Sequence, residues 1–246
     1  MSVEEKKVVK PYNKSDKSKK EEVAEMFDNI SGRYDFLNHF LSLGIDKLWR
    51  KRAIKMLKPL QPKKIIDLAT GTGDFAIAAL KLNPTEVVGV DISNGMLEKG
   101  REKMKKRNVE HIISMKNGDS EDLPFEDNYF DGLTVGFGVR NYENLEKGLA
   151  EMLRVINKGG MAVILEFSKP KKFPVKQSFQ FYSKYIIPLL GKSISKDKSA
   201  YAYLPESVAA FPEGQDFLDI LKKVGYRDVK AKPVSGGIAT IYTGVK

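Results

Sequence analysis

A regular alternation of short apolar runs and helical segments between residues 63 and 168 limits the possible folds of this chain most strongly. Five apolar runs predict strands, at Lys64–Ala69, Glu86–Val90, His111–Met115, Phe130–Gly136 and Gly160–Phe167. Between them, apolar spacing predicts helices at Asp74–Leu82, Ser93–Arg107 and Leu145–Ile156. Strands that alternate with helices form parallel βαβ units, and strands that are apolar throughout need helices on both faces of the sheet. The sequence therefore predicts an α/β fold with a doubly wound parallel sheet.

Helices precede this alternating region and a strand pair follows it. Apolar residues recur every three to four positions from Val23 to Leu57, which predicts helices interrupted near Ser31. Near the other end, two strands at Asp228–Pro233 and Ile238–Val245 lie so close in sequence that they are expected to pair antiparallel. The prediction is thus a seven-stranded, mostly parallel sheet with a C-terminal antiparallel pair and an N-terminal helical segment.

We divide the chain into a flexible, lysine-rich tail at residues 1–20 and a single domain at 21–246. The expected parts of that domain are N-terminal helices at 21–62, a cofactor-binding core at 63–168, a lid insert at 169–212, and a C-terminal helix and strand pair at 213–246. The insert is separated from the core because it is rich in Phe, Tyr, Pro and Lys and leaves the strand–helix rhythm.

The composition excludes several kinds of chemistry. The chain has no cysteine, which excludes disulfides, thiolate metal sites and a cysteine nucleophile. With only His39 and His111, a histidine-rich metal cluster is excluded too, and no metal is expected. The net charge of +10 favours anionic partners such as nucleic acid, acidic lipid headgroups or an anionic substrate, although a solvated lysine surface explains the charge as well. Apolar runs are too short to span a bilayer, so a cytoplasmic protein is expected.

Two glycines, Gly71 and Gly73, directly follow the first predicted strand. Glycine lets the backbone turn sharply and lets a ligand approach without a Cβ in the way. Asp91 ends the second strand, 20 residues beyond Gly71, where a carboxylate can accept from ribose hydroxyls. A nicotinamide dinucleotide and S-adenosylmethionine both fit this pattern. Asp67, just before the glycines, suits the cationic sulfonium and ammonium of S-adenosylmethionine and would repel a pyrophosphate.

Asp119 follows the third predicted strand, where its carboxylate can accept from an adenine amino group. An ordinary Asx turn in the segment Gly118–Phe125 explains the same residues. The adenine-binding interpretation of Asp119 is favoured because Asp91 occupies the corresponding place at the end of the second strand. The carboxyl ends of parallel strands share one edge of the sheet, so both carboxylates are expected there.

At this point the sequence resembles a family. Residues 34–49 and 154–170 are similar to the two signatures of the ubiquinone/menaquinone biosynthesis C-methyltransferases, and residues 136–141 and 201–207 fit as well. The likeness extends over about residues 20–246. The sequence departs from the family pattern at Asn157-Lys158, where Lys-Pro is usual, and at Gly136, where a serine is often a cofactor contact.

The resemblance implies a Rossmann-like class I methyltransferase fold and S-adenosylmethionine as the cofactor. Carried over residue by residue, it implies the following contacts: Gly71, Thr72 and Gly73 with the methionine part, Asp91 with ribose, Asp119 and Ser120 with adenine. Asp67 is expected either to order the glycine loop or to meet the ammonium.

The implied reaction transfers a methyl group to a ring carbon of a prenylated demethylmenaquinol. The alternatives are the same chemistry on a ubiquinone-pathway benzoquinol, or an RNA or other small-molecule methyltransferase. A phenol has a pKa of about 10, so a cation must stabilise the ionised ring. Arg140 is the expected cation, with a surface salt bridge as its alternative. Asn141 is expected to bond a ring oxygen or to cap a helix, and His39 to act as the base or to be a polar helix residue.

Three further residues are expected at the substrate. Tyr34 lines the quinol pocket or packs in the core, and Glu166 and Ser168 close the pocket or form a polar strand end. Residues Lys169–Gly191 are expected to form a lid that admits the prenyl tail and touches the membrane surface, or else a satellite core. These expectations describe a cytoplasmic enzyme, peripheral at the inner face of the membrane, with a prenylated quinol as substrate and no nucleic acid partner. The alternative that the protein binds the cofactor without catalysing a reaction stays open.

Overall fold

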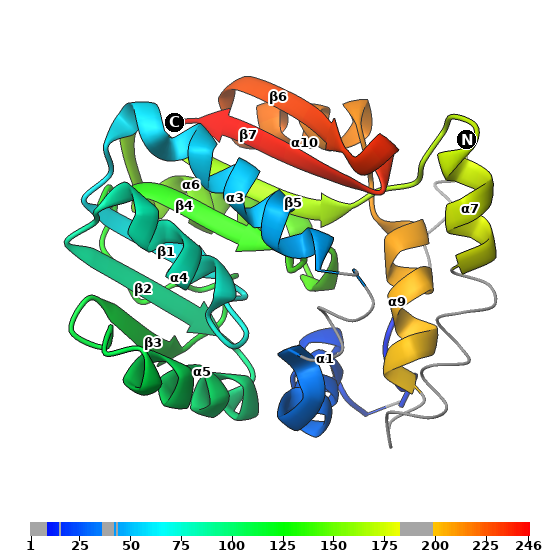
Figure 1. Cartoon of the computed structure of the whole chain (residues 1–246), viewed down its shortest axis with the longest axis horizontal. Helices are drawn as coiled ribbons and strands as arrows, with labels where there is room; N and C mark the ends of the chain where they lie inside the picture. Colours follow the sequence, from blue (N-terminus) through cyan, green and yellow to red (C-terminus); the bar gives the residue numbers. More distant parts are fainter. Residues whose placement is uncertain (1–8, 15, 36–41, 43, 183–198) are drawn as a thin grey trace.

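The computed structural model describes residues 9–14, 16–35, 42, 44–182 and 199–246. A seven-stranded sheet forms its centre, in the order β3-β2-β1-β4-β5-β7-β6 (Figure 1). The strands are β1 Lys64–Leu68, β2 Glu86–Asp91, β3 Ile113–Asn117, β4 Phe130–Gly136, β5 Ile156–Phe167, β6 Arg227–Val234 and β7 Ala239–Val245. Strands β1 to β5 pair in parallel, and β7 pairs antiparallel with both β5 and β6. The predicted fold class is confirmed.

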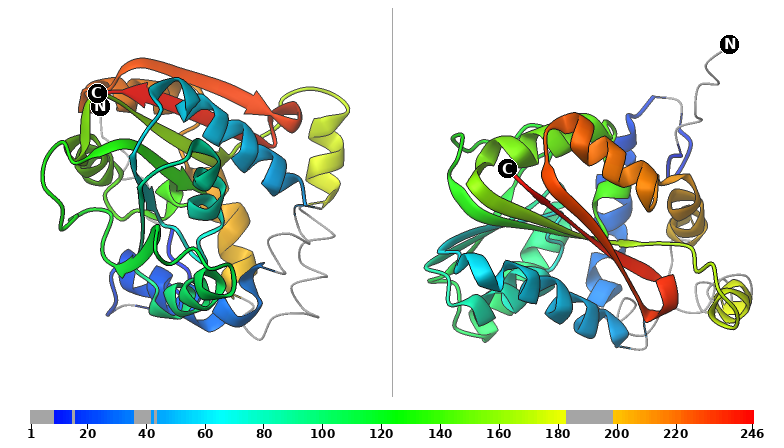
Figure 2. Two further views of the ribbon diagram at one scale, coloured as in Figure 1. Left: turned by 60° about the vertical axis from the view of Figure 1, so that its left-hand side comes forward. Right: turned by 90° about the horizontal axis from the view of Figure 1, so that it is seen from above.

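Helices cover both faces of the sheet, as Figures 1 and 2 show. Helices α3 (Ile45–Leu57), α4 (Asp74–Ala79) and α5 (Asn94–Lys106) cover one face, and α6 (Leu145–Val155) and α10 (Gln215–Val224) cover the other. Each face has its own core. Side chains such as Trp49 and Leu57 pack against one side of the strands, and Leu149 and Phe217 pack against the other. Burial on both faces explains why the strands read as continuous apolar runs.

Three helices lie outside these layers, beyond the carboxyl ends of the strands (Figure 1). They are α1 (Lys19–Ile30, followed by a 3₁₀ turn η1 at Ser31–Arg33), α7 (Val175–Phe181) and α9 (Ser199–Ala210). A capping box fixes the start of α1: the Ser18 side chain accepts from the Glu21 backbone N–H, and the Glu21 carboxylate accepts from the Ser18 N–H. Helix α1 thus begins inside the segment that the sequence assigned to a flexible tail.

Two strands begin two or more residues away from their predicted starts. Strand β5 begins at Ile156, four residues early, because Ile156 pairs with Phe130 although it also continues the apolar stripe of α6. Gly159 then takes a φ of +82°, which a glycine adopts without strain, where the pairing shifts register. Strand β3 begins at Ile113 instead of His111. Neither shift moves a residue away from the strand ends at which the site is built.

Candidate active site

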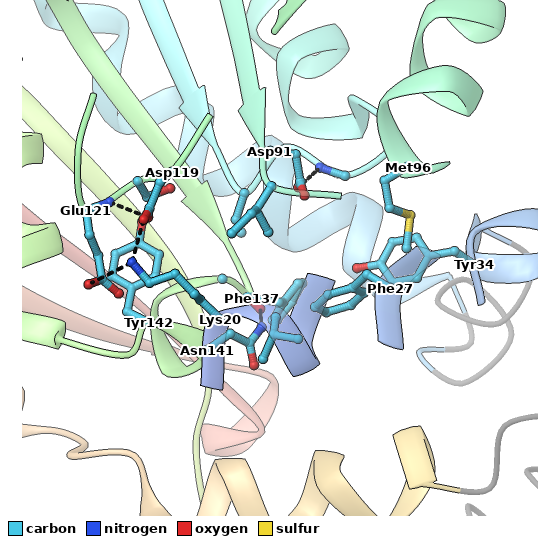
Figure 3. A pocket seen from close by; sticks show the side chains of 17 residues that line it. Lys20, Phe27, Tyr34, Asp91, Met96, Asp119, Glu121, Phe137, Asn141 and Tyr142 are labelled. Carbon is cyan, nitrogen blue, oxygen red and sulfur yellow. Dashed lines mark hydrogen bonds and ion pairs between the residues drawn. The ribbon is translucent and has the colours of Figure 1, made fainter. Parts of the chain in front are cut away.

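A pocket opens where strands β1, β2, β3 and β4 end, and helix α1 forms its outer wall (Figure 3). We call it the cofactor pocket. It is lined by Lys20, Val23, Phe27, Tyr34, Ala69, Gly71, Asp91, Ile92, Met96, Asp119, Ser120, Glu121, Gly136, Phe137, Gly138, Asn141 and Tyr142. Six of the predicted site residues are therefore brought together, although they come from segments more than a hundred residues apart: Tyr34, Gly71, Asp91, Asp119, Ser120 and Asn141.

The glycine loop after β1 is held from below by Asp67, which is fully buried. Its carboxylate accepts from the hydroxyls of Thr70 at 2.5 Å and Thr134 at 2.7 Å, and from the backbone N–H of Ala76 at 3.1 Å. Burial raises the pKa of Asp67 to about 6, against these hydrogen bonds. This geometry corresponds to the first of the two roles expected of Asp67, the ordering of the loop.

Gly73 needs to be glycine at the end of that loop. Its φ is +82°, in the left-handed region, and a Cβ added there would overlap the Met104 side chain. Between the two glycines, Thr72 turns away from the pocket. Its hydroxyl donates to Asp35 at 2.5 Å and accepts from the Lys103 ammonium at 2.8 Å. The Thr72 side chain therefore ties the loop to α5 and to the segment after η1, and is not among the described lining residues.

Asp91 faces the glycine loop from the end of β2. One of its carboxylate oxygens accepts from the Gly71 N–H at 2.7 Å and the other from the Ser93 N–H at 2.9 Å. Each oxygen keeps a second lone pair, so the carboxylate can still accept from a bound ligand. Burial raises the pKa of Asp91 to about 6, opposed by these two backbone hydrogen bonds.

A lysine from α1 reaches across the pocket to Asp119. The Lys20 ammonium lies 2.6 Å from Asp119 Oδ2 and 3.9 Å from Glu121 Oε2, and Figure 3 shows its side chain extending between the two carboxylates. Partial burial opposes ionisation of Asp119, but the hydrogen bonds from Lys20 and from the Glu121 N–H, together with the charges of Lys20 and Lys147, outweigh burial and hold the pKa of Asp119 below its usual value. The sequence reading missed Lys20 because it assigned this residue to the tail. The pattern Ser18–Glu21 is a capping box, and it was the available signal that a helix starts there.

A second, larger cavity adjoins the first; we call it the apolar cavity. Its volume is about 610 Å³ and its lining is almost entirely hydrophobic. Helices α1, α3, α7 and α9 supply most of its wall: Met26, Phe27, Ile30, Ile45, Trp49, Val175, Ser178, Phe179, Ala200, Tyr203, Leu204, Pro205, Val208 and Ala209. Three side chains, Phe27, Tyr34 and Phe137, line both cavities and so form their shared wall.

Arg140 and Asn141 stand at this junction, in the 3₁₀ turn η4 (Val139–Asn141) after β4. Arg140 lines the apolar cavity and Asn141 lines the cofactor pocket. The Arg140 guanidinium is 7% exposed and pairs at 2.9 Å with Glu166, which is fully buried. Burial raises the pKa of Glu166, although Arg140 opposes the shift. Among the described residues, Arg140 Nε has no hydrogen-bond partner, which leaves a buried donor unsatisfied.

Comparison with known proteins identifies the relatives of this chain. The profile of the ubiE/COQ5 methyltransferase family matches residues 15–246. The chain belongs to the ubiE/COQ5 methyltransferase family. It is 52% identical over 239 residues to a demethylmenaquinone methyltransferase of Bacteroides fragilis, a match that covers 97% of each chain. It is 43% identical over 230 residues to a ubiquinone/menaquinone biosynthesis C-methyltransferase of Geobacter sulfurreducens, covering 93% of this chain and 90% of the relative.

Solved structures place this family member in a wider fold group. A SAM-dependent methyltransferase of Thermotoga maritima superposes with a TM-score of 0.64 at 18% identity, covering 90% of this chain and 99% of the other. A SAM-dependent methyltransferase of Aquifex aeolicus gives a TM-score of 0.56 at 17% identity, covering 79% and 89%. The Rossmann-like methyltransferase fold expected from the sequence is thereby confirmed.

Two of the three substrate residues predicted for this ubiE/COQ5 methyltransferase, Glu166 and Ser168, line neither cavity in the described part of the chain. Glu166 lies beneath Arg140 and is not among the described residues that line either cavity. The Ser168 hydroxyl donates to the Gly237 carbonyl at 2.8 Å and bonds Thr240 at 2.9 Å, so it joins β5 to β7 instead of facing a cavity. His39 lies outside the described residues, as do residues 183–198 of the predicted lid insert. In the part of the chain that is described, no helix combines the length and apolarity needed to cross a bilayer.

Proposed function

We propose that this ubiE/COQ5 family member transfers a methyl group from S-adenosylmethionine to a ring carbon of a prenylated demethylmenaquinol. The products are menaquinol and S-adenosylhomocysteine. The observation that carries the proposal is the shared wall: a polar pocket at the strand ends opens against a large apolar cavity, with a buried arginine donor at the junction. The Bacteroides fragilis relative, by its name, acts on demethylmenaquinone and supports this choice of ring.

The residues of the cofactor pocket fit S-adenosylmethionine. The Asp91 carboxylate has lone pairs for ribose hydroxyls, and Asp119 has a carboxylate that can accept from the adenine amino group once Lys20 moves aside. At Gly71 the backbone has no side chain to block the methionine part. Bound there, S-adenosylmethionine supplies an electrophilic methyl group. The buried carboxylates of the pocket also favour a cationic ligand over a pyrophosphate.

At the junction, the protein can favour the ionised ring. A quinol hydroxyl has a pKa of about 10, and its phenolate pushes electron density onto the ring carbon that is methylated. Arg140 lines the apolar cavity and its side chain is 7% exposed, so its guanidinium places a positive charge in an apolar, nearly water-free position, where it stabilises developing negative charge strongly. Glu166 holds the guanidinium in place by its ion pair. The prenyl tail fits the apolar lining of α7 and α9.

A membrane-facing surface would supply this substrate, because a prenylated quinol partitions into lipid. Phe173, two residues before α7, is 81% exposed, and Phe181, the last residue of α7, is 60% exposed; other residues of this helix line the apolar cavity. Residues 168–196 carry seven lysines and no Asp or Glu. Aromatic side chains among lysines favour an anionic bilayer surface, so the proposal includes a peripheral, transient contact there.

The test of the reaction is methyl transfer from labelled S-adenosylmethionine to reduced short-chain demethylmenaquinol. The oxidised quinone and a demethylated ubiquinone-pathway benzoquinol serve as comparisons. We expect transfer to the reduced naphthoquinol and none to the quinone. Transfer to the benzoquinol as well would extend the substrate range, in line with the dual name of the Geobacter sulfurreducens relative. Transfer to neither quinol would overturn the proposal.

The test of the membrane contact is sedimentation with vesicles. Wild-type protein is expected to bind vesicles with 30% phosphatidylglycerol about tenfold more tightly than phosphatidylcholine vesicles. Reversing the charge of Lys171, Lys172 and Lys176 to Glu should abolish the difference. The matched control reverses three exposed lysines on α5, Lys99, Lys105 and Lys106, and should bind nearly as well as the wild type. Equal loss in both variants would contradict a specific surface.

A further inference from the structure

A tyrosine from the insert reaches the reaction site. Tyr203 lies on α9, is 3% exposed, and lines the apolar cavity. Its hydroxyl donates to Asn141 Oδ1 at 3.0 Å, across 62 residues of sequence. Because Asn141 lines the cofactor pocket, this hydrogen bond spans the wall between the two cavities. It connects a helix outside the sheet layers to the turn that carries Arg140.

The direction of this hydrogen bond decides which way the Asn141 amide faces. A side-chain amide has an acceptor oxygen and a donor nitrogen, and rotation by 180° exchanges them. With Oδ1 accepting from Tyr203, the nitrogen lies on the opposite side, where it makes one long contact of 3.5 Å to the Phe137 carbonyl. Its other hydrogen is left to donate to a ligand. A rotated amide would present its oxygen instead, which repels an ionised ring oxygen.

Tyr203 remains a donor under working conditions. Burial raises its pKa to about 12, while the nearby Arg140 opposes the shift and Glu166 adds to it. The phenol is thus protonated across the neutral range and keeps a hydrogen to donate to Asn141 Oδ1. The Phe137 carbonyl, which can only accept, keeps the amide nitrogen on the other side.

The same turn is held from its other side by α1. The Lys19 ammonium donates to the carbonyl oxygens of Arg140 at 3.0 Å and Tyr142 at 2.8 Å. The backbone of η4 is therefore fixed by α1, whereas the orientation of the Asn141 side chain depends on α9. Ala200, Leu204 and Val208, from the same helix as Tyr203, line the apolar cavity, so a tail bound there contacts the helix that carries the tyrosine.

We infer that Tyr203 is a positioning residue: it holds the Asn141 amide with its nitrogen on the side away from α9, at the wall where an oxygen of the acceptor ring must come close to the transferred methyl group, and so makes methyl transfer depend on the docking of α9. The inference rests on the proposed function. If Tyr203 acts in this way, α9 contributes to turnover as well as covering the apolar cavity.

The experiment is a double-mutant cycle on turnover with reduced short-chain demethylmenaquinol. Tyr203→Phe removes only the hydroxyl and is expected to lower kcat about tenfold, the size expected for one buried hydrogen bond. KM for the quinol and Kd for S-adenosylhomocysteine should each stay within about threefold. In an Asn141→Ala background, Tyr203→Phe should have almost no further effect, because the side chain through which it acts is gone.

The matched control is Tyr226→Phe. Tyr226 is also a buried tyrosine, and its hydroxyl donates to the Leu149 carbonyl at 3.2 Å in the core behind the sheet. This variant loses a buried hydrogen bond and should keep wild-type kcat. A tenfold effect of Tyr203→Phe in both backgrounds, or an equal loss in Tyr226→Phe, would overturn the inference while wild-type turnover leaves the proposed function standing. No wild-type turnover would overturn both.

Discussion

The cofactor pocket and the apolar cavity lie side by side but take their walls from different kinds of structure. The cofactor pocket is built on strand ends, and backbone N–H groups hold the Asp91 carboxylate at fixed distances. The apolar cavity is enclosed mainly by α1, α3, α7 and α9, and its wall consists of side chains that are far apart in sequence. The first cavity is thus positioned by the sheet, while the second depends on how four helices pack.

This difference predicts a separation of effects. Changes at the strand ends should act on cofactor affinity and leave the chemistry intact. Changes in the helices should act on the quinol, and changes at the junction should act on turnover. Each variant below is chosen to break or sharpen that separation, in order of decreasing effect.

The largest effect is expected at the junction, for Arg140→Ala combined with Glu166→Gln. The second change removes the buried charge that would otherwise lose its cation. Turnover should fall about 10²–10³-fold, as is common when a donor to a developing anion is removed. S-adenosylhomocysteine affinity, measured by calorimetry, should stay within threefold. Arg154→Ala, which loses surface ion pairs to Glu151 and Asp127, is the control and should retain turnover. Turnover within threefold of wild type in the double variant would remove Arg140 from the mechanism.

Asp91→Asn tests the cofactor pocket. It replaces one acceptor oxygen of a buried carboxylate and should weaken S-adenosylhomocysteine binding about 10–100-fold. At saturating S-adenosylmethionine, kcat should be nearly unchanged, because the residue does not touch the apolar cavity in the described part of the structure. Asp127→Asn, at an exposed carboxylate, is the control. A large loss of kcat with normal affinity would contradict the separation.

Val208→Trp tests the apolar cavity from α9. The larger side chain occupies space in the cavity and should raise KM for a long-chain prenyl quinol about tenfold, and for a short-chain quinol less. Affinity for S-adenosylhomocysteine should not change. Steady-state kinetics with the two chain lengths gives the comparison, and an equal rise for both would show that the tail does not occupy this cavity.

The smallest effect concerns pH. Asp91 has its pKa raised to about 6 by burial, and a protonated carboxyl loses acceptor capacity for ribose. S-adenosylhomocysteine affinity should therefore fall about fourfold between pH 7 and pH 5.5, as follows from a single ionisation near 6. In Asp91→Asn the dependence should disappear. A dependence that persists in this variant would assign it to another group.

Folding stability should respond to the same carboxyls with the opposite sign. The folded-state pKa values of Asp67 and Asp91 lie above the unfolded value, so the folded state binds more protons between about pH 4 and pH 6. Their contribution to stability is fully present below about pH 4 and is lost as the pH rises through about 6. Ligand binding at Asp91 and folding thus make opposite demands on one buried carboxyl.

The sequence predicted the cofactor pocket better than the apolar cavity, for a physical reason. The spacing of apolar residues and the residue types that form turns are local signals. The strand ends, the glycine loop and Asp91 could therefore be placed from neighbouring residues. The contact of Lys20 with Asp119 joins positions 99 residues apart, and that of Tyr203 with Asn141 joins positions 62 apart. Such pairs depend on how helices dock, which no local pattern encodes. Ile156 shows the limit within one segment, since it fits both a helical stripe and a strand.

The wall shared by the two cavities has a thermodynamic consequence. Phe27 and Tyr34 can adopt one arrangement at a time, and that arrangement faces both ligands at once. If occupation of one cavity favours the arrangement suited to the other, the affinities are linked, and linkage is reciprocal. The factor by which the cofactor product strengthens quinol binding must then equal the factor by which the quinol strengthens its binding. Two titrations would test this: the affinity for the quinol is measured with and without the cofactor product, and the affinity for the cofactor product with and without the quinol. Both should give the same factor of change in affinity.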